Sequence, residues 1–205
     1  MGWLPRLLTG TRAAAPQRWV VVDVETSGMD ATRDALIAVG AVALVDGRVV
    51  PKDSFELIVR QVSASARANI LVHGVGAAAQ LNGVDPPRAV RAFLDYVGQA
   101  PLLAFHARFD RGFIARAVKA YVNQPFDNPW LDIADLAPAL DKTGLRSLDE
   151  WLRHYSIPVS ARHSAASDAF ATALLTMRLL SLAARAGTTS FAGLQRLARH
   201  AKWLH

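Results

Sequence analysis

Two carboxylates stand two positions apart in an apolar stretch, WVVVDVETSG at residues 19–28, as Asp23 and Glu25. The stretch is typical of a buried strand, in which side chains two positions apart point to the same face. The two acids therefore project together, and the intervening valines point to the opposite face, into a core. Two like charges in an apolar setting are unfavourable without a cation. The alternative is that one acid is solvated at the strand end while the other caps a turn.

Two further acids and a histidine stand where predicted strands end and helices begin. Asp110 follows the apolar strand LLAFH, and Asp168 lies in the first turns of a long predicted helix. Small residues flank Asp168 in HSAASDAFA, which allows that helix to approach another backbone closely. His163 stands five residues before Asp168. Each has a simple alternative role, because acids near helix N-termini complement the helix dipole and a lone histidine is often a surface residue.

Taken together, these residues have the chemistry of a centre that cleaves phosphodiesters. Four converging carboxylates would repel one another by several kcal/mol, on the order of the energies of unpaired buried charges. Two divalent cations roughly 3.5–4 Å apart would turn that repulsion into binding, clamp a phosphodiester and activate a water. A histidine with a pKa near ~6.5 could take the proton from that water. The chain has no cysteine, so oxygen ligands and hence Mg²⁺ or Mn²⁺ are expected.

The elements that must position these groups indicate an α/β domain with a mixed sheet flanked by helices. Strands are predicted over 19–25, 35–45 and 54–60, and the dipeptide Asp46-Gly47 predicts a hairpin between the second and third. The capping-box pair Ser147 and Glu150 predicts the start of a helix. The remaining predicted elements are helix 86–98, strand 101–107, helix 110–122, a short strand and helical turn over 130–140, helix 147–157, helix 163–187 and a basic helix over 190–204.

Composition favours a polyanionic partner. The 205 residues carry a formal net charge of +6, with a pI of about 10.3, so nucleic acid is expected before an acidic membrane. No uninterrupted apolar run reaches the ~18 residues of a membrane span, and no signal-peptide pattern is found. We expect a soluble, cytoplasmic protein that binds no membrane. Its expected parts are a loosely ordered lead-in (1–17), one catalytic domain (18–187) and a basic C-terminal helix packed on or next to it (188–205).

Three motifs carry a resemblance to a known family. The segments VVVDVETSG, LLAFHARFDRGFI and RHSAASDAFATALL resemble the three exonuclease motifs of the DnaQ-like (DEDDh) 3′–5′ exonuclease family. That family includes the proofreading epsilon subunit of bacterial DNA polymerase III. The resemblance spans residues 19–183 and implies a ribonuclease H-like fold with a mixed five-stranded sheet. It also implies that Asp23, Glu25, Asp110 and Asp168 bind two divalent metal ions and that His163 is the general base.

The resemblance further implies residues that bind the substrate. Thr26 matches a position that contacts the terminal nucleotide, although it is also an ordinary strand-terminal threonine. The segment LVHGV resembles the family's Ile-His-Gly-Ile loop, so His73, Gly74 and Val75 are expected to line the nucleotide pocket; the alternative is a plain glycine turn. His106 is also expected at the substrate, and it stands where the family has asparagine in His-Asn-Ala. The candidate phosphate contacts are Arg108, Arg111, Arg116 and Arg162.

The function implied is a 3′–5′ exonuclease that releases nucleoside 5′-monophosphates, with single-stranded DNA as the expected substrate in proofreading or repair. Replication or repair proteins are the expected protein partners. One alternative is an RNA-directed enzyme that resembles oligoribonuclease or ribonuclease T. Two others are a non-catalytic nucleic-acid-binding module and an interaction subunit that uses the basic C-terminal helix.

Overall fold

The computed structural model describes residues 17–159 and 164–202 of the chain, and these form a mixed five-stranded sheet with helices on both faces. The strand order is β3-β2-β1-β4-β5, with the first three strands antiparallel and the last two parallel to β1. The strands are β1 (Arg18–Thr26), β2 (Leu36–Val45), β3 (Arg48–Ile58), β4 (Leu102–Ala104) and β5 (Trp130–Asp132). The α/β class and the five-stranded mixed sheet predicted above are confirmed.

The β2–β3 hairpin follows its predicted turn. Asp46 and Gly47 both have positive φ, 50° and 74°, as a two-residue type I′ turn requires. The third strand starts at Arg48, immediately after the turn, so the prediction that it starts at residue 54 was wrong. The register shifts within β3, where the partners of Val42 and Ala43 are Ser54 and Val50. Residues 51–53, between Val50 and Ser54, include Pro51, which an edge strand tolerates. This irregularity obscures the alternation of apolar and polar residues in the sequence.

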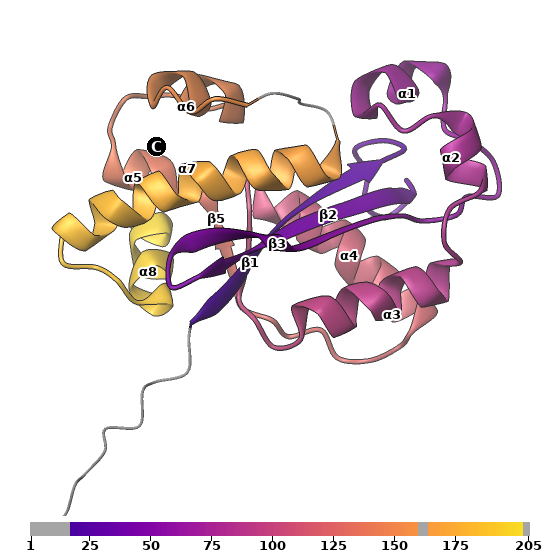
Figure 1. The fold of residues 1–205 in the computed structure, drawn as a ribbon, viewed down its shortest axis with the longest axis horizontal. Helices are drawn as coiled ribbons and strands as arrows, with labels where there is room; N and C mark the ends of the chain where they lie inside the picture. Colours follow the sequence, from indigo (N-terminus) through magenta and orange to yellow (C-terminus); the bar gives the residue numbers. More distant parts are fainter. Residues whose placement is uncertain (1–16, 160–163, 203–205) are drawn as a thin grey trace, which may run out of the picture.

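The helices form two layers and one separate pair (Figure 1). One face of the sheet carries α3 (Pro86–Val97) and α4 (Ala107–Tyr121). The other face carries α5 (Ile133–Leu140), α6 (Leu148–His154), α7 (Ala165–Arg185) and α8 (Phe191–Lys202). Ser147 and Glu150 form the predicted capping box. The pair α1 (Arg67–His73) and α2 (Ala77–Leu81) lies beyond the end of the sheet; both helices are too short to show apolar periodicity in the sequence.

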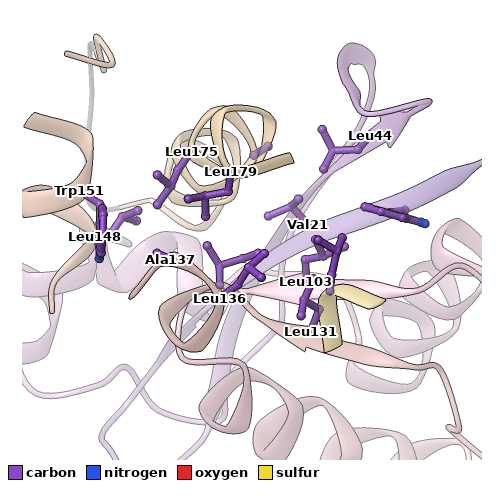
Figure 2. Packing of buried hydrophobic residues seen from close by; sticks show 14 of the residues in the cluster. Val21, Leu44, Leu103, Leu131, Leu136, Ala137, Leu148, Trp151, Leu175 and Leu179 are labelled. Carbon is purple, nitrogen blue, oxygen red and sulfur yellow. The ribbon is translucent and has the colours of Figure 1, made fainter. Parts of the chain in front are cut away.

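The side chains of β1 alternate between two apolar cores. Val20, Val22 and Val24 pack with α3 and α4, as predicted for the face opposite the acids. Trp19 and Val21 pack with α5–α8 on the other face, and Figure 2 shows Val21 among the leucines of that cluster. The two cores anchor β1 on both faces, so the acids near its C-terminal end are carried by the central strand of the sheet.

Helix α7 is the longest described helix and the centre of the second core. By length and composition it could cross a membrane. Its fully buried residues Leu175 and Leu179, however, pack against the sheet, as in the core helices of many globular domains. Helix α8 belongs to the same core through Leu194, which is 0% exposed, and the Gln195 carboxamide donates to the Trp130 carbonyl on edge strand β5. Deleting α8 would therefore expose apolar surface.

Candidate metal-binding active site

Three carboxylates from β1 and α7 converge. Each of Asp23, Glu25 and Asp168 offers an oxygen atom, and these atoms lie within 4.8 Å of one another. All three residues are partly exposed, so an ion or a water molecule can reach them from solvent. Clustered carboxylate oxygens are the ligands that Mg²⁺ and Mn²⁺ prefer. The structure thus brings together three of the four predicted metal-binding acids within the span of a single ion's coordination shell.

A glycine in β2 allows α7 to reach β1. Gly40 is paired with Asp23 across the β1–β2 ladder. A Cβ atom at Gly40 would lie 2.1 Å from the carbonyl carbon of Ala165 and 2.2 Å from the backbone nitrogen of Ala166. The first turn of α7 therefore lies directly on the β2 backbone, and Asp168, in that first turn, reaches the acids of β1. A lone glycine in an apolar strand is a sequence signal for such an approach.

Asp110 is the most enclosed of the predicted acids. It lies in the first turn of α4 and is 3% exposed. Burial raises the pKa of the Asp110 carboxyl well above its usual range, and the nearby charges of Asp132 and Glu25 raise it further. Hydrogen bonding from the backbone at Val24, next to Glu25, opposes this rise. A cation held beside Glu25 would relieve the cost of ionising Asp110, which fits a role at the metal site.

Asp132 was missed by the sequence analysis and adjoins this site. It ends β5, and its Oδ1 accepts from the backbone N–H of His106 at 3.1 Å and of Ala134 at 3.0 Å. The first bond holds the residue that precedes α4, and the second caps the N-terminus of α5. The signal available in the sequence was an acid directly between a short strand and a helix.

Replacing Asp132 with alanine is expected to destabilise the protein, and asparagine is expected to be tolerated. Alanine removes the α5 cap and leaves the His106 N–H without its partner, which costs about 1–2 kcal/mol. Asparagine keeps an oxygen acceptor for both N–H groups. Thermal unfolding of Asp132→Ala should show a Tm lower by roughly 2–8 °C. A melting temperature equal to that of Asp132→Asn would contradict the capping role.

His106 has a left-handed backbone conformation, with φ of 66° and ψ of 49°. Asparagine, aspartate and histidine are the non-glycine residues enriched there. This explains physically how histidine can occupy the position where the resembled motif has asparagine. Its ring is exposed and packs edge-on against Phe105, with centroids 4.8 Å apart. The structure therefore places the His106 side chain at the start of α4, where it is accessible.

The other predicted substrate-binding residues lie around the end of β1 and in the α1–α2 connection. The Thr26 hydroxyl donates to the Gly28 carbonyl at 2.6 Å. Gly74 ends α1 in a left-handed conformation, and Val75 is partly exposed. His73, by contrast, is buried, and both its ring nitrogens have partners within the protein. A contact from this segment to a nucleotide would therefore involve its backbone or Val75.

The predicted phosphate contacts and the predicted general base differ in whether the structure shows them exposed to solvent. Arg108 and Arg111 are exposed on the first turns of α4, beside Asp110. Arg116 is partly buried and donates to the Asp34 carbonyl. His163 and Arg162 lie outside the residues that the structure describes; His163 directly precedes Ser164, the N-cap of α7. Of the five residues assigned to catalysis, four are thus placed in one region by the structure.

Known proteins resemble this chain over most of its length. Residues 20–176 match the profile of the exonuclease (RNase_T) family. The chain is 34% identical over 190 residues to a DNA polymerase III subunit epsilon-like protein of Rhodobacter capsulatus, covering 90% of this chain and 27% of that protein. It is 26% identical over 179 residues to the PolC-type DNA polymerase III of Thermotoga petrophila, covering 87% of this chain and 13% of that protein. The match thus spans about a quarter or less of these relatives' length.

A solved structure shows the same fold. Escherichia coli exonuclease I, crystallised with a dT13 oligonucleotide, superimposes with a TM-score of 0.71 at 17% identity, over 83% of this chain and 42% of that one. The five-stranded sheet and its flanking helices are therefore a ribonuclease H-like fold. With the family profile covering most of the chain, the protein belongs to the exonuclease family.

Proposed function

We propose that this protein is a metal-dependent 3′–5′ exonuclease that hydrolyses phosphodiester bonds at DNA 3′ ends and releases nucleoside 5′-monophosphates. The observation that carries the proposal is the convergence of Asp23, Glu25 and Asp168 within 4.8 Å, in a chain of the exonuclease family. The alternative of a strand-end acid and a turn cap does not account for a third carboxylate arriving from α7.

The donor set fits divalent cations. Asp23, Glu25 and Asp168 would hold Mg²⁺ or Mn²⁺, and Asp110, next to Glu25, would complete a site for two ions. When bound, two such ions would neutralise the phosphodiester, stabilise the leaving oxygen and make a water more acidic. The protein itself fixes the acids on β1, α4 and α7, so the site keeps its geometry without substrate.

We assign the proton transfer to His163. This role comes from the resemblance of RHSAASDAF to the third exonuclease motif. A neutral imidazole next to the N-cap of α7 would accept the proton of the attacking water. Exposed Arg108 and Arg111 would offset the negative charge of the acids and contact the phosphates of the incoming strand.

The expected substrate is single-stranded DNA. The solved exonuclease I carries a dT13 oligonucleotide, and the related sequences are named for DNA polymerase III. Proofreading or repair alongside replication proteins in the cytoplasm is the setting we propose on the same basis. Matched RNA oligonucleotides provide the direct comparison, because discrimination between the two depends on the 2′-hydroxyl.

Replacing Asp23 with alanine should reduce exonuclease activity about 1000-fold, because it removes a ligand that faces both Glu25 and Asp168. The assay follows 3′-labelled and 5′-labelled single strands with Mg²⁺ or Mn²⁺, and release of label as mononucleotide from the 3′ end alone establishes polarity. Asp95→Ala, an exposed acid on α3, is the matched control. If Asp23→Ala retained most of the activity, the assignment of Asp23 as a metal ligand would be refuted.

Replacing His163 with alanine is expected to lower kcat about 100-fold or more, in the range of general-base catalysis, and to leave Mn²⁺ affinity close to wild type. Titration with Mn²⁺ followed by electron paramagnetic resonance measures the affinity separately from turnover. Unchanged kcat across pH 6–9 would exclude His163 as the base.

A further inference from the structure

A buried polar network joins α1 and α2. Gln80 in α2 is 0% exposed, and its side chain makes three hydrogen bonds. Its Oε1 accepts from the backbone N–H of Ser65 at 2.8 Å. Its Nε2 donates to the Ser65 Oγ at 3.0 Å and to the Val75 carbonyl at 2.8 Å. One carboxamide thus connects the segment before α1 to the segment after it.

His73 completes this network from the C-terminal end of α1. Its Nδ1 accepts from the Val75 N–H at 3.0 Å, and its Nε2 lies 3.1 Å from the Ser65 Oγ. Because Nδ1 is an acceptor, the neutral ring carries its proton on Nε2 and donates to Ser65. Burial lowers the pKa of His73, which favours this neutral form. Ser65, His73 and Gln80 together form the α1–α2 network.

The network takes the place of an apolar core in this part of the molecule. His73 is the buried side chain of α1, and Gln80 is the buried side chain of α2. Of the large apolar residues of α1, Leu71 and Val72 are 77% and 69% exposed, and Ile70 is only partly buried. Buried hydrogen bonds weaken sharply when one partner is removed, since the other is left unsatisfied. The position of α1 therefore depends on the network to an unusual degree.

The same segment lies beside the strand that carries the acids. The Asn69 carboxamide in α1 donates to the Ser27 carbonyl, directly after the last residue of β1. A cleft of about 330 Å³ opens there, and its lining includes Ser27, Ser65 and Gln80. Figure 1 shows α1 and α2 at this end of the sheet. Two residues of the network, Ser65 and Gln80, thus line a cleft next to the metal-binding strand.

We propose that Ser65 and Gln80 are positioning residues for the substrate strand. They hold α1 beside the end of β1, where Asn69 contacts Ser27, so that residues 73–75 at the end of this helix are already in place when the terminal nucleotide arrives. The inference depends on the proposed exonuclease function, and it assigns part of the substrate affinity to side chains that touch no reacting atom. Loss of the network would lower the fraction of molecules with the segment in place, which raises KM and leaves kcat nearly unchanged.

The test compares variants of the full chain on a 3′-labelled single strand. Gln80→Met removes all three hydrogen bonds at similar volume, and Ser65→Ala removes only the hydroxyl. Each is expected to raise KM about tenfold, equivalent to about 1.4 kcal/mol, with kcat within about twofold of wild type. Ser65→Thr keeps a hydroxyl at this position, so its KM should stay close to that of the wild type. Gln99→Met makes the same chemical change at an exposed residue after α3 and should leave KM unchanged.

Hydrogen exchange and Mn²⁺ affinity give the independent readouts. Faster amide exchange in residues 65–75, with unchanged exchange in the sheet and unchanged Mn²⁺ affinity, would support the proposal together with the KM increase. Faster exchange with a KM equal to that of Gln99→Met would overturn it, since the network would then have only a structural role. A wild-type chain that neither binds nor degrades the strand would refute the proposed function and this inference with it, whereas the preceding outcome leaves the function intact.

Discussion

Replacing Gly40 with alanine is expected to abolish the metal site without unfolding the sheet. The added methyl group would overlap the Ala165 and Ala166 backbone, so no side-chain rotation can relieve the contact. The first turn of α7 must move away from β2, and Asp168 moves with it, away from Asp23 and Glu25. A displacement of about 1 Å at a catalytic group can cost about 100-fold in rate, and a weaker Mn²⁺ affinity should accompany that loss.

The measurements for this variant are exonuclease rate, Mn²⁺ affinity and circular dichroism. Gly112→Ala provides a matched glycine-to-alanine control, because its methyl group would meet only the Ala31 side chain, at 3.1 Å, and alanine favours the helix. The control should keep activity near that of wild type. Wild-type metal affinity in Gly40→Ala would show that the approach of α7 to β2 does not determine the position of Asp168.

Replacing Asp110 with asparagine is expected to change activity and stability in opposite directions. Activity should fall at least about 100-fold, because an amide cannot supply the negative charge that a divalent cation requires at this position. The metal-free protein should become more stable at neutral and alkaline pH, because asparagine removes a buried carboxyl that is costly to ionise. A Tm increase of a few degrees corresponds to about 1 kcal/mol in a chain of this size.

The stability gain has a defined pH dependence. The pKa of Asp110 is higher in the folded state than in the unfolded chain, so the folded state binds more protons between the two values. Stability of the metal-free wild type therefore decreases as pH rises through that window, and the Asp110→Asn variant lacks this decrease. The Tm difference should be largest above the window and vanish at acidic pH. Thermal unfolding in EDTA, with exposed Asp95→Asn as control, measures it; a wild type that is more stable than the variant at pH 8 would contradict the burial argument.

Local sequence patterns were sufficient to predict the β1 alternation, the hairpin at Asp46-Gly47 and the α6 capping box. These features depend on neighbouring residues, through the two-residue period of a strand, the positive φ of a type I′ turn and reciprocal capping bonds. The candidate acids could also be chosen from the sequence, since charges placed on apolar elements are costly without a function. The order of these acids along the chain matches the order of the three family motifs.

The convergence of the acids on one site depends on packing between segments that are distant in the sequence. Gly40 brings α7 onto β2 through a contact between segments more than 120 positions apart, which no local pattern specifies. Asp132 acquires its role because β5 ends beside His106, the residue that precedes α4. His73 was expected to line a pocket, yet its side chain is enclosed by Ser65 and Val75. Local spacing predicts which face a side chain takes, but packing between distant segments decides what lies opposite it, because burial and close backbone contact are properties of the assembled fold.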